Sequence, residues 1–327
     1  MKGKKQKQDY FEGRKVYELT EEEQGAKITR KEADACRHKA EMRWYRRLVV
    51  LNILIIIVAI AIVAGSLAEV EDWTEAVKTQ VTEEFSEDYV EDKTQYRYDA
   101  LEDIPMALEI FAYGVVIMIF LIPALYYMYA TYRTMALRIT EKNFPEVYAL
   151  IEEYAQRLGI KTPKAYVIQQ NGVLNAFSAF LPGRQWICIH SELFEVAYRE
   201  HKDMDALAFV IAHEMAHIYY KHATLGYMLS IMFSRVIPVL GTTASRAREY
   251  SCDRLAQRLT GTDGLDAMLV MAVDRHLYKL VDKEDYIEDM RSQRGFGLWL
   301  FNLLKDHPVL CKRVVALEEG RGSGKLY

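Results

Sequence analysis

Residues 205–220, with the sequence DALAFVIAHEMAHIYY, contain the pattern His213-Glu214-Met215-Ala216-His217. The stretch is rich in apolar residues and has neither Gly nor Pro, which predicts a buried helix. Side chains four residues apart lie on one face of a helix, so both imidazoles are expected to point the same way, with Glu214 beside them. A catalytic zinc ion requires two such histidine ligands and a nearby carboxylate.

A third protein ligand is expected elsewhere, because catalytic zinc usually takes three and leaves the fourth position for water. The best candidate is Glu249, within the helical pattern SRAREYSCDRLA of residues 245–256. Asp253 lies on the same face and could accept a hydrogen bond from the outer nitrogen of a ligand histidine, which would fix its tautomer. Without the histidines, such a carboxylate pair is more often a solvated surface.

Two further motifs flank these helices. Residues 174–179 read LNAFSA, and Asp306-His307-Pro308 is followed by Arg313. Together, the four motifs over residues 140–320 resemble those of the HtpX-like membrane zinc metallopeptidases, relatives of the CAAX prenyl endopeptidases in the gluzincin group. The resemblance covers the first half of the chain less well.

This resemblance implies that His213, His217 and Glu249 hold one zinc ion per chain. It also implies that Glu214 is the general base for a water that the zinc ion activates, and that this water attacks a peptide carbonyl. The sequence therefore predicts a zinc metalloendopeptidase, with Asp253 supporting a ligand.

The remaining candidate site residues are expected to contact substrate. His307 or Arg313 would supply the second donor to the developing oxyanion, although His307 could instead be a surface histidine before a proline. Asn175, Ala176 and Phe177 are expected at an edge strand that binds extended peptide. The alternative for Asn175 is a turn residue after the preceding Asn-Gly pair.

The pattern of residues predicts a mostly helical α+β fold. A helix is expected over residues 144–158 and another over residues 263–280. Short β-rich runs predict a small sheet of three strands, at residues 165–169, 173–177 and 186–190. We expect residues 133–320 to form a zincin-like metallopeptidase domain that follows two transmembrane helices.

Two uncharged apolar runs are each long enough to cross a bilayer, at residues 48–68 and 110–132 up to the charged Arg133. The first begins too far from Met1 and is too long for a signal peptide. The second contains Pro123, which membrane helices tolerate, and ends in tyrosines typical of the headgroup region. A buried core helix is the alternative for each run.

Flanking charges predict the orientation of these spans. Basic residues precede the first span and follow the second, whereas the loop of residues 69–109 is strongly acidic. By the positive-inside rule, residues 1–47 and everything after residue 132 are cytoplasmic, and the acidic loop is extracytoplasmic in a cell-membrane protein.

A third apolar stretch, residues 225–240, separates the two predicted zinc helices. A single crossing here would place His217 and Glu249 on opposite sides of the membrane, and the interval is too short for two crossings. The stretch also contains Arg235 and Pro238. We therefore expect a short hairpin or a segment at the membrane surface.

The polar first thirty residues and residues 321–327 are expected to be loose tails. The formal net charge of −4 disfavours a nucleic-acid partner. The four cysteines form no CxxC pair and are expected to be reduced packing residues, with a metal role for Cys252 as the lesser alternative.

The predicted function is a membrane-anchored zinc endopeptidase that cleaves cytosol-accessible or membrane proteins, with a quality-control role implied by the resemblance alone. The expected partners are a protein or peptide substrate and the lipid bilayer. The alternative is a catalytically silent zinc-binding scaffold or sensor, although a structural zinc would not need the base Glu214. A prenyl endopeptidase or a transporter is disfavoured, because only two spans are clear and neither carries a central charge.

Overall fold

The computed structural model describes residues 10–11, 13–84, 104–169, 176–181 and 184–327. The chain forms two compact units, Met1–Val49 with Tyr129–Tyr327 and Val50–Met128, which are described separately below. The first unit, here called the main unit, contains every described residue of the predicted metal site.

The second unit is built from long helices. The helices α2 (Glu41–Gly65) and α5 (Met106–Met135) belong to it over most of their length, together with α3 (Leu67–Glu84). Among the described residues, α2 and α5 are long and apolar enough to cross a membrane, with mean hydropathies of 3.2 and 2.3 over their most apolar windows. Helix α2 begins seven residues before its predicted uncharged run, and α5 extends beyond its predicted run at both ends, because no helix breaker separates the apolar residues from the flanking ones.

The main unit contains a four-stranded mixed sheet in the order β1-β2-β4-β3. Its strands are β1 (Ala136–Arg138), β2 (Lys164–Ile168), β3 (Ala176–Leu181) and β4 (Arg184–His190). Strands β2 and β4 are parallel and the other pairs are antiparallel. The predicted strands at residues 165–169 and 186–190 match β2 and β4 to within two residues at each end. The prediction at residues 173–177 overlaps β3, although residues 173–175 lie outside the described part. The three-residue β1 was not predicted.

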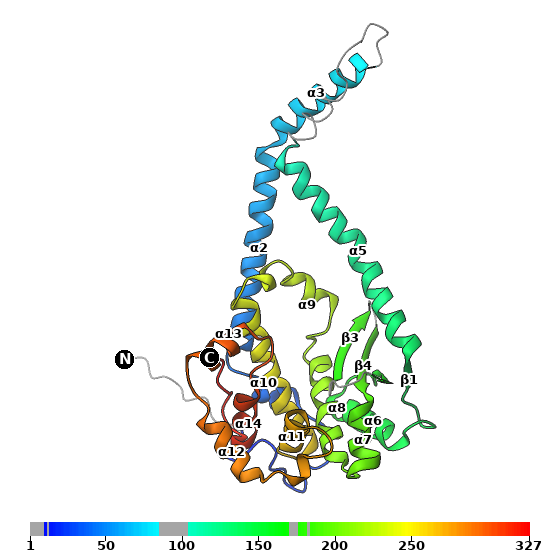
Figure 1. The fold of residues 1–327 in the computed structure, drawn as a ribbon, viewed down its shortest axis with the longest axis vertical. Helices are drawn as coiled ribbons and strands as arrows, with labels where there is room; N and C mark the ends of the chain where they lie inside the picture. Colours follow the sequence, from blue (N-terminus) through cyan, green and yellow to red (C-terminus); the bar gives the residue numbers. More distant parts are fainter. Residues whose placement is uncertain (1–9, 12, 85–103, 170–175, 182–183) are drawn as a thin grey trace. The chain divides into compact units, whose positions relative to one another are not determined.

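The helices of the main unit pack around α8 (Met204–Tyr219), whose residues Leu207, Ile211 and Met215 are buried in the core (Figure 1). Helix α8 contacts α10 (Leu240–Thr260) most extensively, and also contacts α6, α11 and the sheet. The other helices are α1 (Arg30–Cys36), α6 (Pro145–Leu158), α7 (Ser191–Glu195), α9 (Leu225–Ser230), α11 (Leu265–Val273), α12 (Lys283–Ser292), α13 (Phe296–Leu304) and α14 (Leu310–Glu319). This confirms a mostly helical fold with a small sheet.

One predicted helix is shorter than expected. The pattern over residues 263–280 predicts a single helix, but α11 ends at Val273 and a 3-10 turn follows at Tyr278–Leu280. Asp274 interrupts the helix, because its φ of 78° cannot continue a right-handed helix.

Several residues between Phe11 and Ile28 pack in the core, contrary to the expectation that the first thirty residues form a loose tail. Phe11, Val16 and Ile28 are buried in the main core. Helix α1 begins with a capping box between Thr29 and Glu32. The acidic residues that look solvated in the sequence have a buried partner: Arg258 of α10 forms ion pairs with Glu23 and Glu32.

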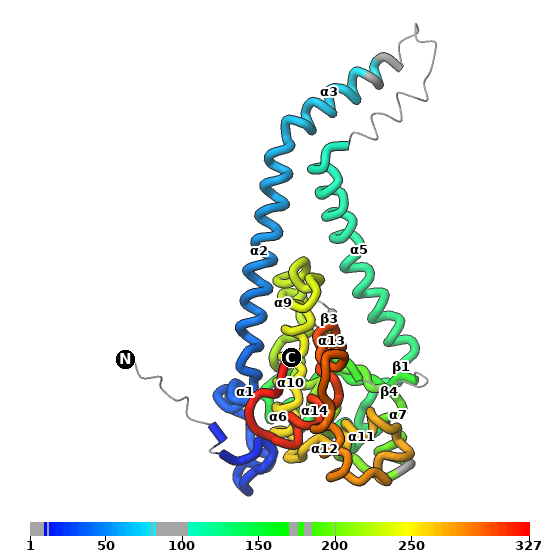
Figure 2. The backbone as a smooth tube through the Cα atoms, turned by 60° about the vertical axis from the view of Figure 1, so that its left-hand side comes forward, coloured from blue at the N-terminus to red at the C-terminus, as the bar shows by residue number. Residues whose placement is uncertain are grey.

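The C-terminal residues also differ from the expected flexible tail. Leu326 is buried, and its carbonyl accepts hydrogen bonds from Arg246 Nε at 3.1 Å and Asn302 Nδ2 at 2.9 Å. The hydroxyl of Tyr250 donates to the Lys325 carbonyl at 3.0 Å. Figure 2 shows this C-terminal segment, in red, beside α10. Polar residues of α10 thus fix both ends of the chain.

The segment between the two predicted zinc helices forms no membrane crossing. It contains the six-residue α9, a 3-10 turn at Ser234–Val236 and the start of α10, each far shorter than the roughly 20 residues that a helical span needs. Ile231 and Ala244 pack with Leu48 in a small buried cluster. Whether this segment contacts lipid stays a prediction.

Gly241 is expected to be essential for the turn that leads into α10. A Cβ atom on Gly241 would lie 2.0 Å from the Arg235 carbonyl oxygen, whereas one on Gly226 of α9 would meet nothing within 4 Å. Gly241→Ala should destabilise the main unit by about 1–3 kcal/mol, the usual cost of overpacking. Thermal unfolding of the detergent-purified chain should show a lower midpoint for Gly241→Ala and little change for the control Gly226→Ala; equal midpoints would contradict this account of the turn.

Candidate metal centre

Helix α8 places the residues of the HExxH pattern inside the main unit. His213 and Glu214 are buried, and His217 is nearly so. The spacing of one helical turn brings His213 Nε2 within 3.3 Å of His217 Nε2. The two ring nitrogens therefore face a common point, as the sequence predicts.

Helix α10 supplies the carboxylate at this point. Glu249 Oε2 lies 3.3 Å from His213 Nε2, and Glu249 Oε1 lies 3.4 Å from His217 Nε2. One donor atom from each of the three residues lies within 4.8 Å of the others. Two imidazole nitrogens that converge on a buried carboxylate form a donor set typical of zinc, so these residues fit the predicted ion.

Asp253 holds the outer nitrogen of one of these histidines. Its Oδ1 lies 2.9 Å from His213 Nδ1, which leaves Nε2 free to face the donor set. Burial would raise the pKa of the Asp253 carboxyl, but the Arg313 charge and the contact with His213 lower it to about 2. Asp253 is therefore an anion that can fix the tautomer of His213.

Arg313 of α14 requires a correction. We predicted that it could stabilise the oxyanion of the reaction, but its guanidinium is committed to Asp253. Arg313 Nε donates to Oδ2 at 2.9 Å and Nη2 donates to Oδ1 at 2.6 Å. A buried carboxylate needs such a paired counter-charge, and this two-point contact explains why Arg313 faces Asp253.

His307 lies in the loop between α13 and α14, and it approaches the donor set from the side of solvent. Its Nδ1 is 2.9 Å from Glu249 Oε2, and its side chain is 68% exposed. The hydrogen bond to Glu249 raises the pKa of His307 above its usual value. The structure thus brings His307, but not Arg313, next to the three potential ligands.

Glu214 points from α8 toward the sheet. Burial raises the pKa of its carboxyl, while the His213 charge and hydrogen bonds with Ser178 act in the opposite direction. Ser178 is a residue of β3 that sequence analysis did not identify as part of the site. A buried carboxyl with a raised pKa is suited to accept and return a proton near neutral pH.

Strand β3 lies at an edge of the described sheet, since within the described residues only β4 pairs with it. Ala176 and Phe177 open the strand, and Asn175 lies outside the described residues. Successive side chains alternate between the two faces of a strand. Phe177 accordingly packs against Trp186 and Tyr132, while its neighbour Ser178 contacts Glu214.

A second group of potential ligands adjoins the first and was not predicted. It consists of His217, His222 and Cys252, whose donor atoms also lie within 4.8 Å of one another. His222 follows α8 after a turn in which Lys221 has a φ of 62°. Helical periodicity does not extend through such a turn, so spacing alone could not place His222 beside His217.

The four cysteines are free and buried, as expected for packing residues. Cys252 is the one beside the metal centre, with its Sγ 3.7 Å from His222 Nδ1. Burial raises the pKa of the Cys252 thiol well above its usual value, and the nearby carboxylates act in the same direction. The thiol form is therefore favoured when no metal is bound.

Comparison with known proteins gives one family match. A sequence model described as Peptidase family M48 matches residues 141–235. The matched segment includes β2, β3, β4 and α8 with its HExxH pattern, and it ends before Glu249. No solved structure matches the chain. Residues 141–235 of this chain are thus similar to the peptidases of family M48, which supports a metallopeptidase.

Proposed function

We propose that this protein is a membrane-anchored zinc endopeptidase of the HtpX-like type. The observation that carries the proposal is the position of Glu214, which lies between the donor set of α8 and α10 and the edge strand β3. A structural zinc site needs ligands but no such carboxylate. The similarity of residues 141–235 to peptidase family M48 supports the same function.

Each residue of the centre has a separate role in this proposal. His213, His217 and Glu249 would hold one zinc ion, which when bound supplies Lewis-acid activation of water and of the peptide carbonyl. Glu214 accepts the proton of the attacking water and returns it to the leaving amine. Its burial and its contact with Ser178 keep it in place during both transfers.

The oxyanion donor in this proposal is His307. It is the candidate donor that lies next to Glu249, and its exposure allows it to reach a substrate carbonyl. Arg313 acts at a distance instead, because its two hydrogen bonds hold Asp253 against His213. Arg313 is therefore a positioning residue.

The substrate in this proposal is an extended segment of a protein. As an edge strand, which pairs only with β4 within the described sheet, β3 offers backbone groups that can pair with a peptide of almost any sequence. Such pairing would lay the peptide across Ser178 and close to Glu214. Asn175 would bind the same peptide just before Ala176. This mode of binding suits quality-control proteolysis, the role that the family resemblance implies.

The membrane arrangement completes the proposal. Helices α2 and α5 would anchor the protein in the cell membrane. Arg43, Arg46 and Arg47 lie near the start of α2, Arg133 lies in the last turn of α5 and Arg138 follows that helix, so the main unit would face the cytoplasm. Substrates would then be cytosolic segments or segments of membrane proteins that reach the cytosolic surface.

The proposed base can be tested with Glu214→Gln, which keeps the shape of the side chain but cannot accept a proton. Cleavage of an unfolded protein by the zinc-loaded, detergent-purified chain should fall about 10²–10⁴-fold, with the zinc content unchanged. Gln185→Glu, at the far end of β4, is a charge-changing control that should remain active. Equal cleavage by Glu214→Gln and the parent would rule out Glu214 as the base. Zinc-loaded parent that cleaves nothing would favour the scaffold function.

The third ligand can be tested by metal analysis of Glu249→Ala. The change removes the only carboxylate that touches both facing nitrogens among the described residues. We expect zinc affinity to fall by more than the roughly 10–100-fold that loss of an outer-sphere partner causes. Glu153→Ala, a surface substitution on α6, should retain zinc. Unchanged zinc in Glu249→Ala would remove Glu249 from the ligand set.

The orientation can be tested with an epitope inserted at position 85, within the acidic loop. The positive-inside rule predicts that antibody binds this epitope in intact cells. An epitope placed at the N-terminus should bind antibody only after the cells are permeabilised. The reverse pattern would show that the topology is inverted.

A further inference from the structure

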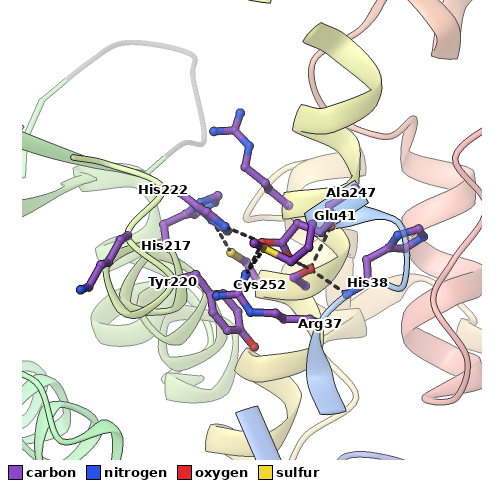
Figure 3. Close-up of polar contacts among 12 residues, drawn as sticks. Arg37, His38, Glu41, His217, Tyr220, His222, Ala247 and Cys252 are labelled. Atoms are coloured by element: carbon purple, nitrogen blue, oxygen red, sulfur yellow. Dashed lines mark hydrogen bonds and ion pairs between the residues drawn. The ribbon is translucent and has the colours of Figure 1, made fainter. Parts of the chain in front are cut away.

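The two nitrogens of the His217 ring face different surroundings. Nε2 faces His213 and Glu249, as described above. Nδ1 points away from them and lies 3.1 Å from Nδ1 of His222 (Figure 3). Within the described residues, no carboxylate forms an ion pair with His217 Nδ1 in the way that Asp253 does with His213 Nδ1.

His222 is held firmly in this position. Its backbone N–H donates to the His217 carbonyl at 2.9 Å, so the chain folds back directly after α8. Its side chain is almost completely buried, next to Tyr220 and Cys252. Its other ring nitrogen, Nε2, lies 3.0 Å from Oε1 of Glu41.

Glu41 is the first residue of α2 and is far from His222 in sequence, yet it is buried beside it. Two further groups hold the carboxylate. Arg37 forms an ion pair with Oε1, and the hydroxyl of Ser251 donates a hydrogen bond to Oε2 (Figure 3). Ser251 belongs to α10 and lies between Glu249 and Asp253 in sequence. The Glu41 carboxylate thus joins α2 to the helix that supplies the third ligand.

The donor and the acceptor can be assigned in each contact from His217 through His222 to Glu41. A metal ligand at His217 Nε2 must present a lone pair there, so the proton of the neutral ring is on Nδ1. His222 Nδ1 is then the acceptor at 3.1 Å, which puts the proton of His222 on Nε2. That proton points to Glu41 Oε1, a carboxylate oxygen that only accepts. Each contact therefore has one donor and one acceptor.

On this basis, and resting on the proposed zinc centre, we propose that His222 and Glu41 are positioning residues for the ligand His217. His222 accepts the Nδ1 proton of His217 and donates its own Nε2 proton to Glu41. The arrangement fixes the tautomer and the ring angle of His217, as Asp253 does for His213. The outer nitrogen of each histidine ligand would then be linked to a buried carboxylate. His213 contacts Asp253 directly, and His217 is linked to Glu41 through the imidazole of His222.

Cys252 raises the alternative that His217 and His222 bind a second metal ion. Its thiol lies 3.7 Å from His222 Nδ1, so His217, His222 and Cys252 could in principle hold a second ion. That arrangement would require His217 to lose its Nδ1 proton and bind a metal at each nitrogen. The hydrogen bonds from His217 to His222 and from His222 to Glu41, here called the relay, keep this proton on His217 Nδ1. The relay therefore predicts one zinc ion per chain.

The test is the rate at which the full detergent-purified chain releases zinc to an excess of a coloured chelator. His222→Ala should release zinc roughly 10–100-fold faster, the usual effect of removing an outer-sphere partner. His222→Asn should largely restore slow release, because its carboxamide oxygen occupies the place of Nδ1 and can accept the same hydrogen bond. Glu41→Gln, which keeps an acceptor oxygen, should release zinc more slowly than Glu41→Ala.

His38→Ala is the matched control. His38 is also buried, at the same junction of α1 and α2, where it stacks on Tyr250 and contacts neither His217 nor His222. Its loss should perturb packing while leaving the rate of zinc release close to that of the parent. If His222→Ala does not fold, the pair Glu41→Gln and Glu41→Ala decides the question through the same rate.

Several results would overturn the relay. Parent-like release by His222→Ala, or equally fast release by His222→Asn and His222→Ala, would show that the acceptor at His222 does not position His217. Two zinc ions per parent chain, one of them lost in Cys252→Ser, would show a second metal site instead. These outcomes are distinct from failure of the zinc centre itself, in which the parent would bind no zinc or Glu249→Ala would keep it.

Discussion

Two buried carboxylates on α10 impose the constraint on which the rest of the main unit depends. Glu249 and Asp253 are almost inaccessible to water, and a buried charge is costly unless it is paired and hydrogen-bonded. The pairing groups come from separate parts of the chain: His213 and His217 from α8, His307 from the loop before α14, and Arg313 from α14 itself. Satisfying these two charges therefore fixes the packing of three segments around one helix.

A related constraint, the burial of charged residues of α10, explains why residues 13–36 and the C-terminal residues pack against the main unit. Helix α10 is rich in polar residues, yet Arg246 and Arg258 are as buried as its apolar residues. Arg246 donates to backbone carbonyls of Leu303, Lys305 and Leu326, while Arg258 pairs with Glu23 and Glu32. A helix with this composition can be buried only when distant segments supply its hydrogen-bond partners. The terminal segments that look like solvated tails in the sequence are these partners.

The sequence could predict features that depend on local geometry, but not those that depend on which distant segments pack together. Helical periodicity predicted α8 and most of α10, and the i, i+4 spacing predicted that His213 and His217 share one face, because these features depend on local geometry. The contacts of Glu249 and Asp253 with these histidines are tertiary, and their prediction rested on the shared helix face of the two carboxylates and on the family resemblance. Sequence spacing could not assign Arg313 to Asp253, or His222 to His217, since tertiary packing decides which partner a long side chain meets. Ser178 was missed for the same reason, because alternation in β3 can be interpreted only once the register with β4 is known.

The position of Glu41 changes where the main unit begins. A domain of residues 133–320 would lack Glu41, the ion-pair partners of Arg258 and the packing of Leu48 against Ile231. Removing them would leave His222 and Arg258, both buried, without their carboxylates, and a buried group that loses its partner is strongly destabilising. Residues 10–49 are therefore part of the fold that surrounds the metal centre. Since α2 starts at Glu41 and is the first candidate membrane span, the proposed anchoring helix would begin at the residue that makes the outer contact of the proposed ligand His217 through His222.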